Sequence, residues 1–483
     1  MSPVRTVETA GRPLPEHAYP ALAEAVAAMA ARHPEWLFPM LPQGIPAPPA
    51  VPAIDLAAAP GTVGEPAAPV PSGSTVLAGD VAVRVADVVV PGRPGVVSVV
   101  ADLGPRTVHA LLGLRAPGAE TFPLPDADEA PVGLLDLDDG LGVLSDALGD
   151  AQYCLALLGA VAGQQGDVER VRRAWMSDES TAIAFDDRIA LAVYGRLPAE
   201  PAPHPGLEMY LALDEVGFNH VAAPIARWRR GGWDLGVVRD YEPGAAGGWA
   251  LALTSLRDLY ASDGPPERAG ADFGPEARRL GTMAARMHLG LDQAYGRRPG
   301  DVVAWVGAVE RSVQRVAPEL LADAEVADLL AALRSMSVPC PAIRTHGDFH
   351  LGRVERTDLG WFVFDFSPGG TPVFGAGTVP PGMHAGAEGA GPVYRSPLAD
   401  VADMLWSFRH VADTAAAERD PSGRLGLSAL ARAWESRNRR AFLSGYLATP
   451  GIRGLVPPAT GLARNLAAAF ELERTAAKLA LHA

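Results

Sequence analysis

The stretch His346–Arg353 (HGDFHLGR), followed shortly by Trp361–Phe366 (WFVFDF), decides the fold. The first stretch places Asp348 in a tight turn behind a short strand, and the second is an apolar strand that ends at Asp365. Metal-assisted phosphoryl transfer uses such a pair of carboxylates, because one orients the attacking hydroxyl and accepts its proton while the other holds magnesium. The alternative is that Asp348 only caps the backbone amides of a β-turn.

On both sides of this motif, apolar residues at helical spacing predict a mostly helical segment over 246–483. Its predicted helices span 276–294, 301–316 and 318–335, and two more start near Ser396 and Ser428. Upstream, the pattern of residues 146–245 predicts a small α+β lobe. It contains a helix within 146–165, a hairpin over 175–196 that turns at Asp186-Asp187, a helix over 205–216, and strands at 221–228 and 233–240.

Residues 1–145 predict a separate N-terminal cap domain. A helix over 20–38 precedes a Pro- and Ala-rich linker over 39–73, and alternating β-branched residues within 74–114 predict a small antiparallel sheet. The expected organisation is therefore α+β, with three domains at 1–145, 146–245 and 246–483.

Composition narrows the function classes. A formal net charge of −15 disfavours nucleic acid and anionic membranes as partners. The two cysteines, Cys154 and Cys340, make no disulfide framework. No apolar run approaches the ~20 residues of a membrane span, and the N-terminus lacks the pattern of a secretion signal. These features predict a cytoplasmic protein with small-molecule partners and no obligate protein partner.

The sequence resembles the aminoglycoside phosphotransferase family, and within it the maltokinase-like branch. Besides the HGDFHLG form of the motif, an ordered set of short matches supports the resemblance: Asp187-Arg188, Leu207-Glu208, Gly217-Phe218, Tyr241–Gly244, Gly248-Trp249, Met287–Leu289, Ser396–Leu398, Asp400–Ala402 and Trp434-Glu435. The resemblance implies a bilobal fold like that of the eukaryotic protein kinases, with ATP and Mg²⁺ as cofactors. It also implies Asp348 as the catalytic residue and Asp365 as the metal ligand.

Two positions depart from the family pattern. Arg353 stands where the family has an Asn or Gln that helps to bind metal, and a guanidinium has no free acceptor for a cation. The metal then depends on Asp365 and other oxygens, or Arg353 itself pairs with phosphate. Ala192 stands where the family has its nucleotide-binding lysine, and Arg196 or another basic side chain is the expected substitute.

The resemblance also implies nucleotide contacts outside the HGD motif. The loop at 177–181 matches the phosphate-covering loop in position but lacks glycine, so an ordinary polar loop is the alternative. Residues 240–242 match the segment that joins the lobes and holds adenine. The predicted cofactor-binding residues are Ser180, Arg196, Glu208, Asp240 and Tyr241.

The acceptor is expected to bind among the C-terminal helices, where carboxylates and aromatic side chains recur. Such residues suit a sugar, and an excess of carboxylates suits a cationic sugar. The predicted substrate-binding residues are His350, Asp403, Trp406, His410, Trp434 and Glu435. Three alternatives stay open: His350 supports the loop, Asp400 only stabilises a helix N-terminus, and Trp434 packs in the core.

The acceptor region departs from the maltokinase pattern. In this the chain resembles the actinobacterial glucosamine kinase branch. The resemblance implies an ATP-dependent sugar kinase that phosphorylates glucosamine to glucosamine 6-phosphate. Maltose or an aminoglycoside is the alternative acceptor. A pseudokinase-like binding module is the alternative of another class, and Arg353 and Ala192 motivate it.

Overall fold

The structure is a computed structural model with two compact units. Of the described residues, those within 4–204 and 222–242 form the N-terminal unit, and those within 205–221 and 244–480 form the C-terminal unit. The described residues are 4–8, 11–32, 54–55, 80–104, 106–125, 127–128, 130–137, 140–163, 168–176, 180–242, 244–262, 264–335, 340–366, 393–419 and 426–480.

The first sheet of the N-terminal unit is built around a β-hairpin. Its strand order is β1-β13-β14-β11-β10-β9-β3. Asp186 and Asp187 turn the hairpin with φ of 51° and 52°, a left-handed conformation that Asp tolerates better than most residues and that tight hairpins need. The strands are β1 (Arg5–Glu8), β3 (Ile54–Asp55), β9 (Arg170–Met176), β10 (Ser180–Phe185), β11 (Ile189–Tyr194), β13 (Pro224–Arg230) and β14 (Trp233–Asp240).

The second sheet of this unit has the order β2-β4-β5-β6-β8-β7, and β12 pairs with β6. Helix α1 (Tyr19–Arg32) packs on it through an apolar face of small residues, and α2 (Ala151–Ala162) contacts strands of both sheets. The strands are β2 (Arg12–Pro13), β4 (Val81–Val90), β5 (Gly95–Leu103), β6 (Arg106–Arg115), β7 (Gly133–Leu137), β8 (Gly140–Asp146) and β12 (Arg196–Leu197).

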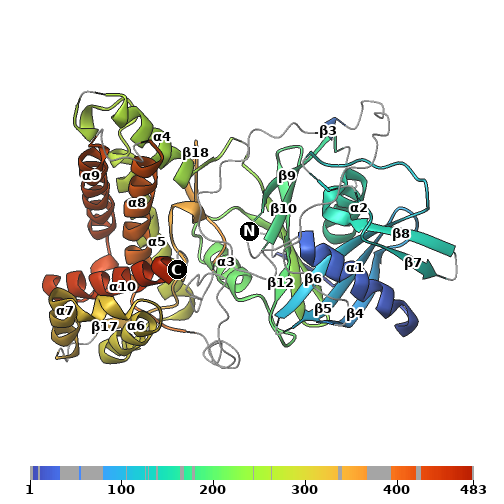
Figure 1. The fold of residues 1–483 in the computed structure, drawn as a ribbon, viewed down its shortest axis with the longest axis horizontal. Coiled ribbons are helices and arrows are strands. Elements are labelled where there is room, and N and C mark those ends of the chain that lie inside the picture. Colours follow the sequence, from blue (N-terminus) through green and yellow to red (C-terminus); the bar gives the residue numbers. More distant parts are fainter. Residues whose placement is uncertain are drawn as a thin grey trace. The chain divides into compact units, whose positions relative to one another are not determined.

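The C-terminal unit is mostly helical, and α8 and α9 run side by side in Figure 1 with α10 across them. Its helices are α3 (Pro205–Glu215), α4 (Gly248–Tyr260), α5 (Gly274–Tyr295), α6 (Val302–Val316), α7 (Ala324–Arg334), α8 (Leu398–Arg419), α9 (Leu427–Ala448) and α10 (Thr460–Ala480). Two small sheets complete it: β15 (Ala246–Gly247) with β18 (Val354–Thr357) and β19 (Gly360–Val363), and β16 (Arg298–Gly300) with β17 (Cys340–Ala342).

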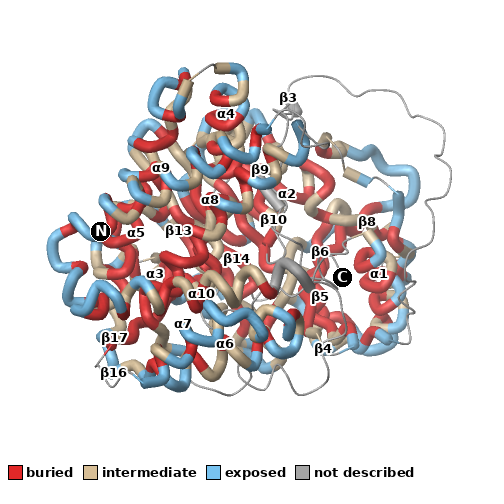
Figure 2. Tube along the Cα trace, turned by 60° about the vertical axis from the view of Figure 1, so that its left-hand side comes forward, coloured by how far each residue is buried: buried red, intermediate tan, exposed pale blue. Residues whose placement is uncertain are grey.

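Close backbone contact joins α5 to α9. A Cβ on Gly281 would lie 2.0 Å from the backbone oxygen of Phe442, and a Cβ on Gly445 would lie 2.0 Å from that of Arg278. Only glycine permits this approach. Helix α8 is buried over much of its length (Figure 2), because α4, α9 and α10 all pack against it. The helix that carries Asp400 and Asp403 is therefore held on several sides.

The secondary structure predicted from the sequence agrees with the structure in most elements. The hairpin, the strands of residues 221–240 and the helices α3, α5 and α6 lie where they were expected. Helix α1 is described only to Arg32, so the end of the predicted helix over 20–38 lies outside the described residues. The predicted linker over 39–73 lies outside them too, apart from Ile54 and Asp55, which form β3. Helix α10 was not predicted.

The domain boundaries predicted at 145 and 245 remain a prediction. Strand pairing crosses the predicted boundary at 145, because β1 and β3 pair with strands of the sheet that residues 170–240 form. Helix α3 groups with the C-terminal unit, where it contacts α5.

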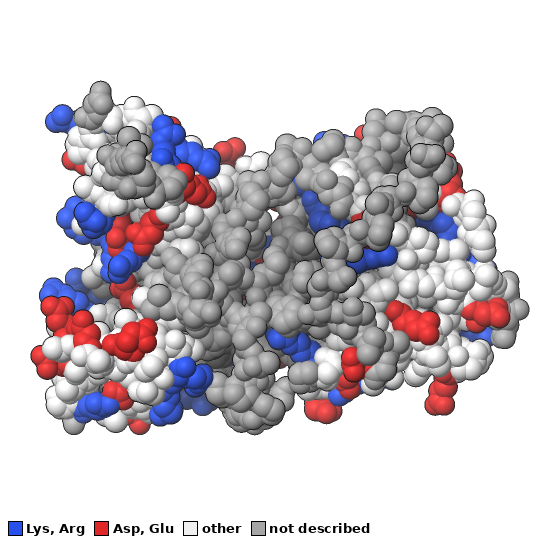
Figure 3. Space-filling view, viewed as in Figure 1, with Lys and Arg blue, Asp and Glu red and all other residues white. Residues whose placement is uncertain are grey.

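Among the helices that the structure describes, none combines the length and apolar composition needed to cross a bilayer. In the view of Figure 3, acidic and basic side chains are interspersed over the helical unit at the left. Both cysteines are free and buried.

Candidate active site

The turn that carries Asp348 is anchored by a buried carboxylate on α8. Asp400 accepts hydrogen bonds from the backbone N–H of His346 at 2.7 Å and of Gly347 at 2.9 Å. Its Oδ2 also lies 3.0 Å from Nε2 of His288, whose Nδ1 lies 2.8 Å from the hydroxyl of Tyr446. Burial opposes the charged form of Asp400, but the bond from His288 and the neighbouring groups outweigh it and lower the pKa.

Asp400 therefore does more than stabilise a helix N-terminus, which was the alternative raised from the sequence. Its two oxygens fix two consecutive backbone amides of the turn, and Gly347, with φ of 88°, supplies the sharp bend. Ser396 caps the start of α8, near which the sequence predicted a helix start, since its Oγ accepts from the N–H of Leu398 at 3.3 Å.

His346 locks the same turn from inside. Its Nδ1 accepts from the backbone N–H of Asp348 at 3.3 Å, so its Nε2 carries the proton and donates to the carbonyl of Phe364 at 3.1 Å. Burial lowers the pKa of His346 to about 4, and the ring stays neutral near pH 7. This histidine ties the turn to the strand that leads to Asp365.

The carboxylate of Asp348 is surrounded by donors. Its Oδ1 accepts from Nη2 of Arg474 at 2.7 Å, and its Oδ2 lies 3.3 Å from both Nε and Nη2 of Arg353. Nε2 of His350 lies 3.3 Å from the same Oδ2. Burial opposes ionisation of Asp348, but His350, Arg474 and Arg353 outweigh it and hold its pKa well below the usual range. The residue is a fixed anion at neutral pH.

His350 supports the loop, which was the alternative raised from the sequence, and its ring also reaches the carboxylate of Asp348. Its Nδ1 accepts from the backbone N–H of Gly352 at 3.0 Å, which places the ring proton on Nε2, facing Asp348. The Nε2–H thus donates to the carboxylate from a fixed orientation.

Asp365 follows β19 and lies beside the same cluster. Its φ of 54° is the left-handed conformation, which is uncommon for a residue other than glycine and recurs at functional sites. Its Oδ2 accepts from Nη1 of Arg353 at 2.7 Å. One guanidinium therefore bridges Asp348 and Asp365, and the two carboxylates converge in one place as the sequence predicted.

Asp403, one turn after Asp400 on α8, pairs with Arg474 of α10. Nη2 of Arg474 lies 2.7 Å from Oδ2 of Asp403, and the same nitrogen bonds Asp348. Burial raises the pKa of Asp403 to about 6 in spite of this pairing, whereas the two carboxylates keep Arg474 charged and raise its pKa. Arg474 therefore connects the predicted substrate residue Asp403 to the predicted base Asp348 through two hydrogen bonds.

Trp406 and His410 are the aromatic residues on the next turns of α8. Their rings are 4.8 Å apart, and the ring of His410 lies 5.2 Å from that of Trp249 on α4. Trp406 is only partly buried. The row of rings offers an apolar surface on the same helix as Asp403.

Trp434 and Glu435 lie elsewhere. The indole of Trp434 is 1% exposed, packs against Phe273 and Phe408, and donates to Oγ of Ser255 at 2.9 Å. The structure favours core packing for Trp434, the alternative raised from the sequence, since a buried ring has no face for a ligand.

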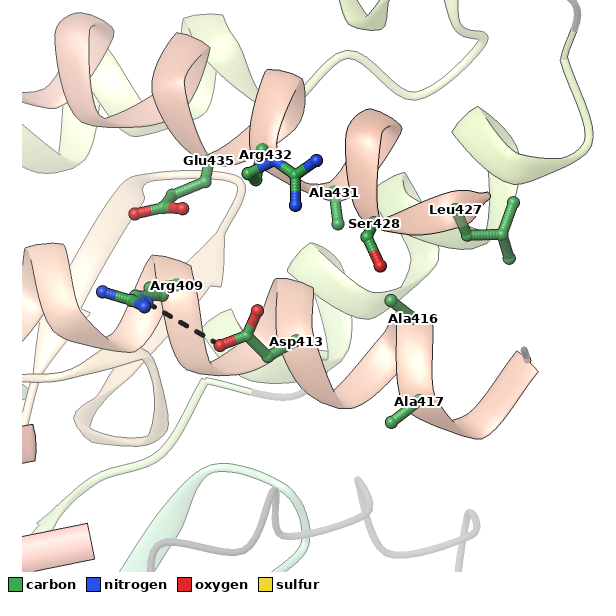
Figure 4. A pocket seen from close by; sticks show the side chains of 9 residues that line it. All are labelled: Arg409, Asp413, Ala416, Ala417, Leu427, Ser428, Ala431, Arg432 and Glu435. Atoms are coloured by element: carbon green, nitrogen blue, oxygen red, sulfur yellow. Dashed lines mark ion pairs between the residues drawn. The ribbon is translucent and has the colours of Figure 1, made fainter. Parts of the chain in front are cut away.

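Glu435 lines a cavity of about 500 Å³ between α8 and α9 (Figure 4). The other lining residues are Arg409, Asp413, Ala416, Ala417, Leu427, Ser428, Ala431 and Arg432, so neither Asp348 nor Asp403 borders this cavity. Burial raises the pKa of Glu435.

The predicted nucleotide residues are spread over both units. In the N-terminal unit, Ser180 begins β10 opposite Tyr194, Asp240 ends β14 with its side chain exposed, and the hydroxyl of Tyr241 accepts from Arg172 at 2.8 Å. Arg196 lies in β12, which pairs with the other sheet of this unit. Glu208 lies on α3 of the C-terminal unit with its side chain exposed. Residues 177–179 lie outside the described residues.

Strand register identifies a second basic side chain near Ala192. Directly opposite residues of antiparallel strands share a face of the sheet. Ala192 pairs with Val237 and Ala190 pairs with Arg239, so Arg239 shares a face with Ala192, whereas Arg196 belongs to a different sheet. Among the substitutes for the absent lysine, the register favours Arg239 over Arg196.

Arg474 and the role of Asp400 were not predicted from the sequence. Arg474 lies on the last helix, 126 positions from Asp348. An amphipathic pattern with Leu462, Leu466 and Phe470 buried marks that helix. The pattern predicts the buried face, but it does not show which carboxylate an arginine on that helix meets.

A curated relative decides the family. A glucosamine kinase from Streptacidiphilus jiangxiensis is 31% identical over 399 residues, which cover 76% of this chain and 82% of that protein. This chain belongs to the glucosamine kinase family. The resemblance to the glucosamine kinase branch, predicted from the sequence, is confirmed. No family model matches the chain.

Solved glucosamine kinase structures share the fold. One, determined in complex with glucosamine, ADP and inorganic phosphate, has a TM-score of 0.51 and 22% identity and covers 83% of this chain and 88% of that one. Another crystal form has a TM-score of 0.52 and 23% identity, with the same coverage of both chains. The predicted α+β, kinase-like fold is thereby confirmed.

Proposed function

We propose that this chain is an ATP-dependent sugar kinase that transfers the γ-phosphoryl group to glucosamine and forms glucosamine 6-phosphate. The observation that carries the proposal is the convergence of Asp348 and Asp365 on one turn-and-strand unit, held by Asp400 and bridged by Arg353. Membership of the glucosamine kinase family supports the choice of acceptor.

Asp348 orients the acceptor hydroxyl in this proposal. Phosphoryl transfer passes through a loose transition state in which positioning and charge stabilisation matter more than strong base catalysis. A carboxylate whose pKa is held low by His350, Arg474 and Arg353 is a weak base but a well-oriented hydrogen-bond acceptor. For the hydroxyl to bind, one of the donors around Asp348 must yield its place.

Asp403 and the rings of Trp406 and His410 are the proposed acceptor contacts. Asp403, with a pKa of about 6, is mostly ionised at neutral pH and gives an ammonium group a charged partner. The partly buried ring of Trp406 offers a surface for the apolar face of a sugar. These contacts favour an amino sugar over a neutral disaccharide.

ATP and Mg²⁺ complete the proposal. Mg²⁺ in such sites takes one or two carboxylates and fills its other positions with phosphate oxygens and water. Asp365 is the carboxylate that fits. The described residues contain no group of three or more His, Cys, Asp or Glu side chains that could hold a metal ion by themselves. A metal held at Asp365 would supply positive charge that offsets the charge of the phosphates. The nucleotide contacts at Ser180, Arg196, Glu208, Asp240 and Tyr241 remain part of the proposal.

An acceptor panel tests the function. ADP release with ATP and Mg²⁺ is measured for glucosamine, glucose, N-acetylglucosamine, maltose and an aminoglycoside. Glucosamine is expected to give the highest kcat/KM, and glucose and N-acetylglucosamine, which lack the ammonium group, are expected to fall by ten-fold or more. Preference for maltose or an aminoglycoside refutes the acceptor assignment, and turnover of no acceptor favours a binding module.

Asp348→Asn tests the role of the base in the same assay. The variant is expected to lose 10²- to 10⁴-fold in kcat, the usual range for such a group. Asp358→Asn is the matched control, because Asp358 is an exposed carboxylate in the turn between β18 and β19. Equal activity of Asp348→Asn and the control removes Asp348 from the mechanism.

A further inference from the structure

Arg353 is a buried cation placed between the two acidic residues of the site. Its Nη1 is 2.7 Å from Asp365, and its Nε and Nη2 are each 3.3 Å from Asp348. The residue is 7% exposed and follows the turn that Asp400 holds, so its position is set by the fold. Its guanidinium reaches both carboxylates at once.

The chemistry of this group limits what else can bind there. In protein kinases, the Asp of the DFG motif and the Asn of the catalytic loop hold two Mg²⁺ ions. A guanidinium stays protonated in proteins and has no lone pair to offer a metal. The guanidinium of Arg353 also occupies an oxygen of Asp365, and it places a positive charge where a second divalent cation would have to enter.

We propose that Arg353 takes the place of one of the two metal ions, so that this chain works with a single divalent cation carried by the nucleotide. The guanidinium neutralises Asp348 and Asp365 and presents a fixed positive charge to the transferred phosphoryl group. This inference rests on the proposed function, because it requires a nucleotide beside the two carboxylates. It also gives Arg353, which the family pattern makes anomalous, a catalytic task in this chain.

A purely structural ion pair is the competing explanation, and it makes a different prediction. If Arg353 only stabilised the loop, its replacement would change stability and activity but not the number of metal ions bound. Metal stoichiometry is therefore the decisive readout, since it does not depend on turnover.

The experiment is a titration of the full-length chain with Mn²⁺ in saturating ADP, with free Mn²⁺ followed by electron paramagnetic resonance. The wild-type chain is expected to bind one Mn²⁺ in an ADP-dependent manner. Arg353→Asn restores an oxygen ligand and removes the charge. Its dissociation constant for a second Mn²⁺ is therefore expected to be at least ten-fold lower than that of the wild-type chain. Arg353→Lys, which keeps the charge, is expected to bind one.

Arg356→Gln is the matched control. Arg356 lies three positions further along, on β18, and pairs with Glu276 of α5 at 2.9 Å instead of with the acidic pair. The Arg356→Gln variant removes the same charge from the same segment, and it is expected to bind one Mn²⁺ as the wild-type chain does. Two tight sites in the wild-type chain, or an unchanged count in a folded Arg353→Asn chain, overturn the inference. If Arg353→Asn does not fold, a second tight site in Arg353→Lys overturns it. Absence of ADP-dependent Mn²⁺ binding in the wild-type chain refutes the proposed function instead.

Discussion

Replacement of Asp400 by asparagine tests how the catalytic turn is held. Asn keeps one acceptor oxygen, which can serve His346 N–H and His288, but its amide group then faces the N–H of Gly347. A buried donor left without a partner costs about 1–3 kcal/mol, and two bonds that lose their charge assistance cost roughly 1 kcal/mol each. The free energy of unfolding should therefore fall by about 3–5 kcal/mol.

Urea unfolding of the full-length chain measures this loss, and hydrogen exchange of the peptide that contains 346–353 locates it. Faster exchange in that peptide is expected, together with a fall in kcat, because the turn positions Asp348. The matched control is Asp413→Asn on the same helix. Its carboxylate is exposed and lies 3.8 Å from Arg409, so its loss should cost no more than about 0.5 kcal/mol. A loss below 1 kcal/mol for Asp400→Asn, with unchanged exchange, would refute the reasoning.

Three further outcomes follow from the same contacts. Trp434→Ala should lower the free energy of unfolding by about 3–5 kcal/mol in urea titrations, since it empties a core position; a loss under 1 kcal/mol contradicts the packing role. Gly281→Ala should destabilise the chain by roughly 1–3 kcal/mol through its contact with α9, whereas Gly461→Ala, with open space around it, should not. Burial raises the pKa of Asp403 to about 6, so the folded state binds the extra proton and the stability that Asp403 contributes is lost as pH rises from 4 through 6. Arg474 is the cation that faces Asp403. The difference in unfolding free energy between the wild-type chain and Asp403→Asn should therefore shrink by about 1–3 kcal/mol as pH rises from 4 to 6. A difference that grows with pH contradicts the raised pKa of Asp403.

Local signals were enough for much of the fold. Turn residues and alternation placed the hairpin at Asp186-Asp187, and helical spacing placed α5 and α6 within a few residues. Such patterns work because backbone preferences and the burial of one face act over a few neighbouring residues. Helix α10 carries the same kind of apolar spacing, but it was not predicted, and Arg474 was missed with it.

The side-chain partners were harder to predict. The motif itself suggested that Asp348 and Asp365 converge, because a turn and the following strand connect them over a short stretch. The sequence left open whether Trp434 packs in the core or meets a ligand, and nothing in it indicated that Glu435 lines a cavity that Asp348 does not border. Aromatic and acidic residues on a helix look alike from the sequence whether they face a core or a ligand.

The sequence by itself determined that this chain has a kinase-like turn with two carboxylates, and it marked Arg353 as the unusual residue. Only the tertiary structure decided which distant residue neutralises Asp348 and which one holds the turn. Arg474 meets Asp348 from the last helix, and Asp400 holds the turn from α8. Ion pairs and buried hydrogen bonds depend on distance in space, and packing brings together residues whose separation along the chain leaves no pattern to detect.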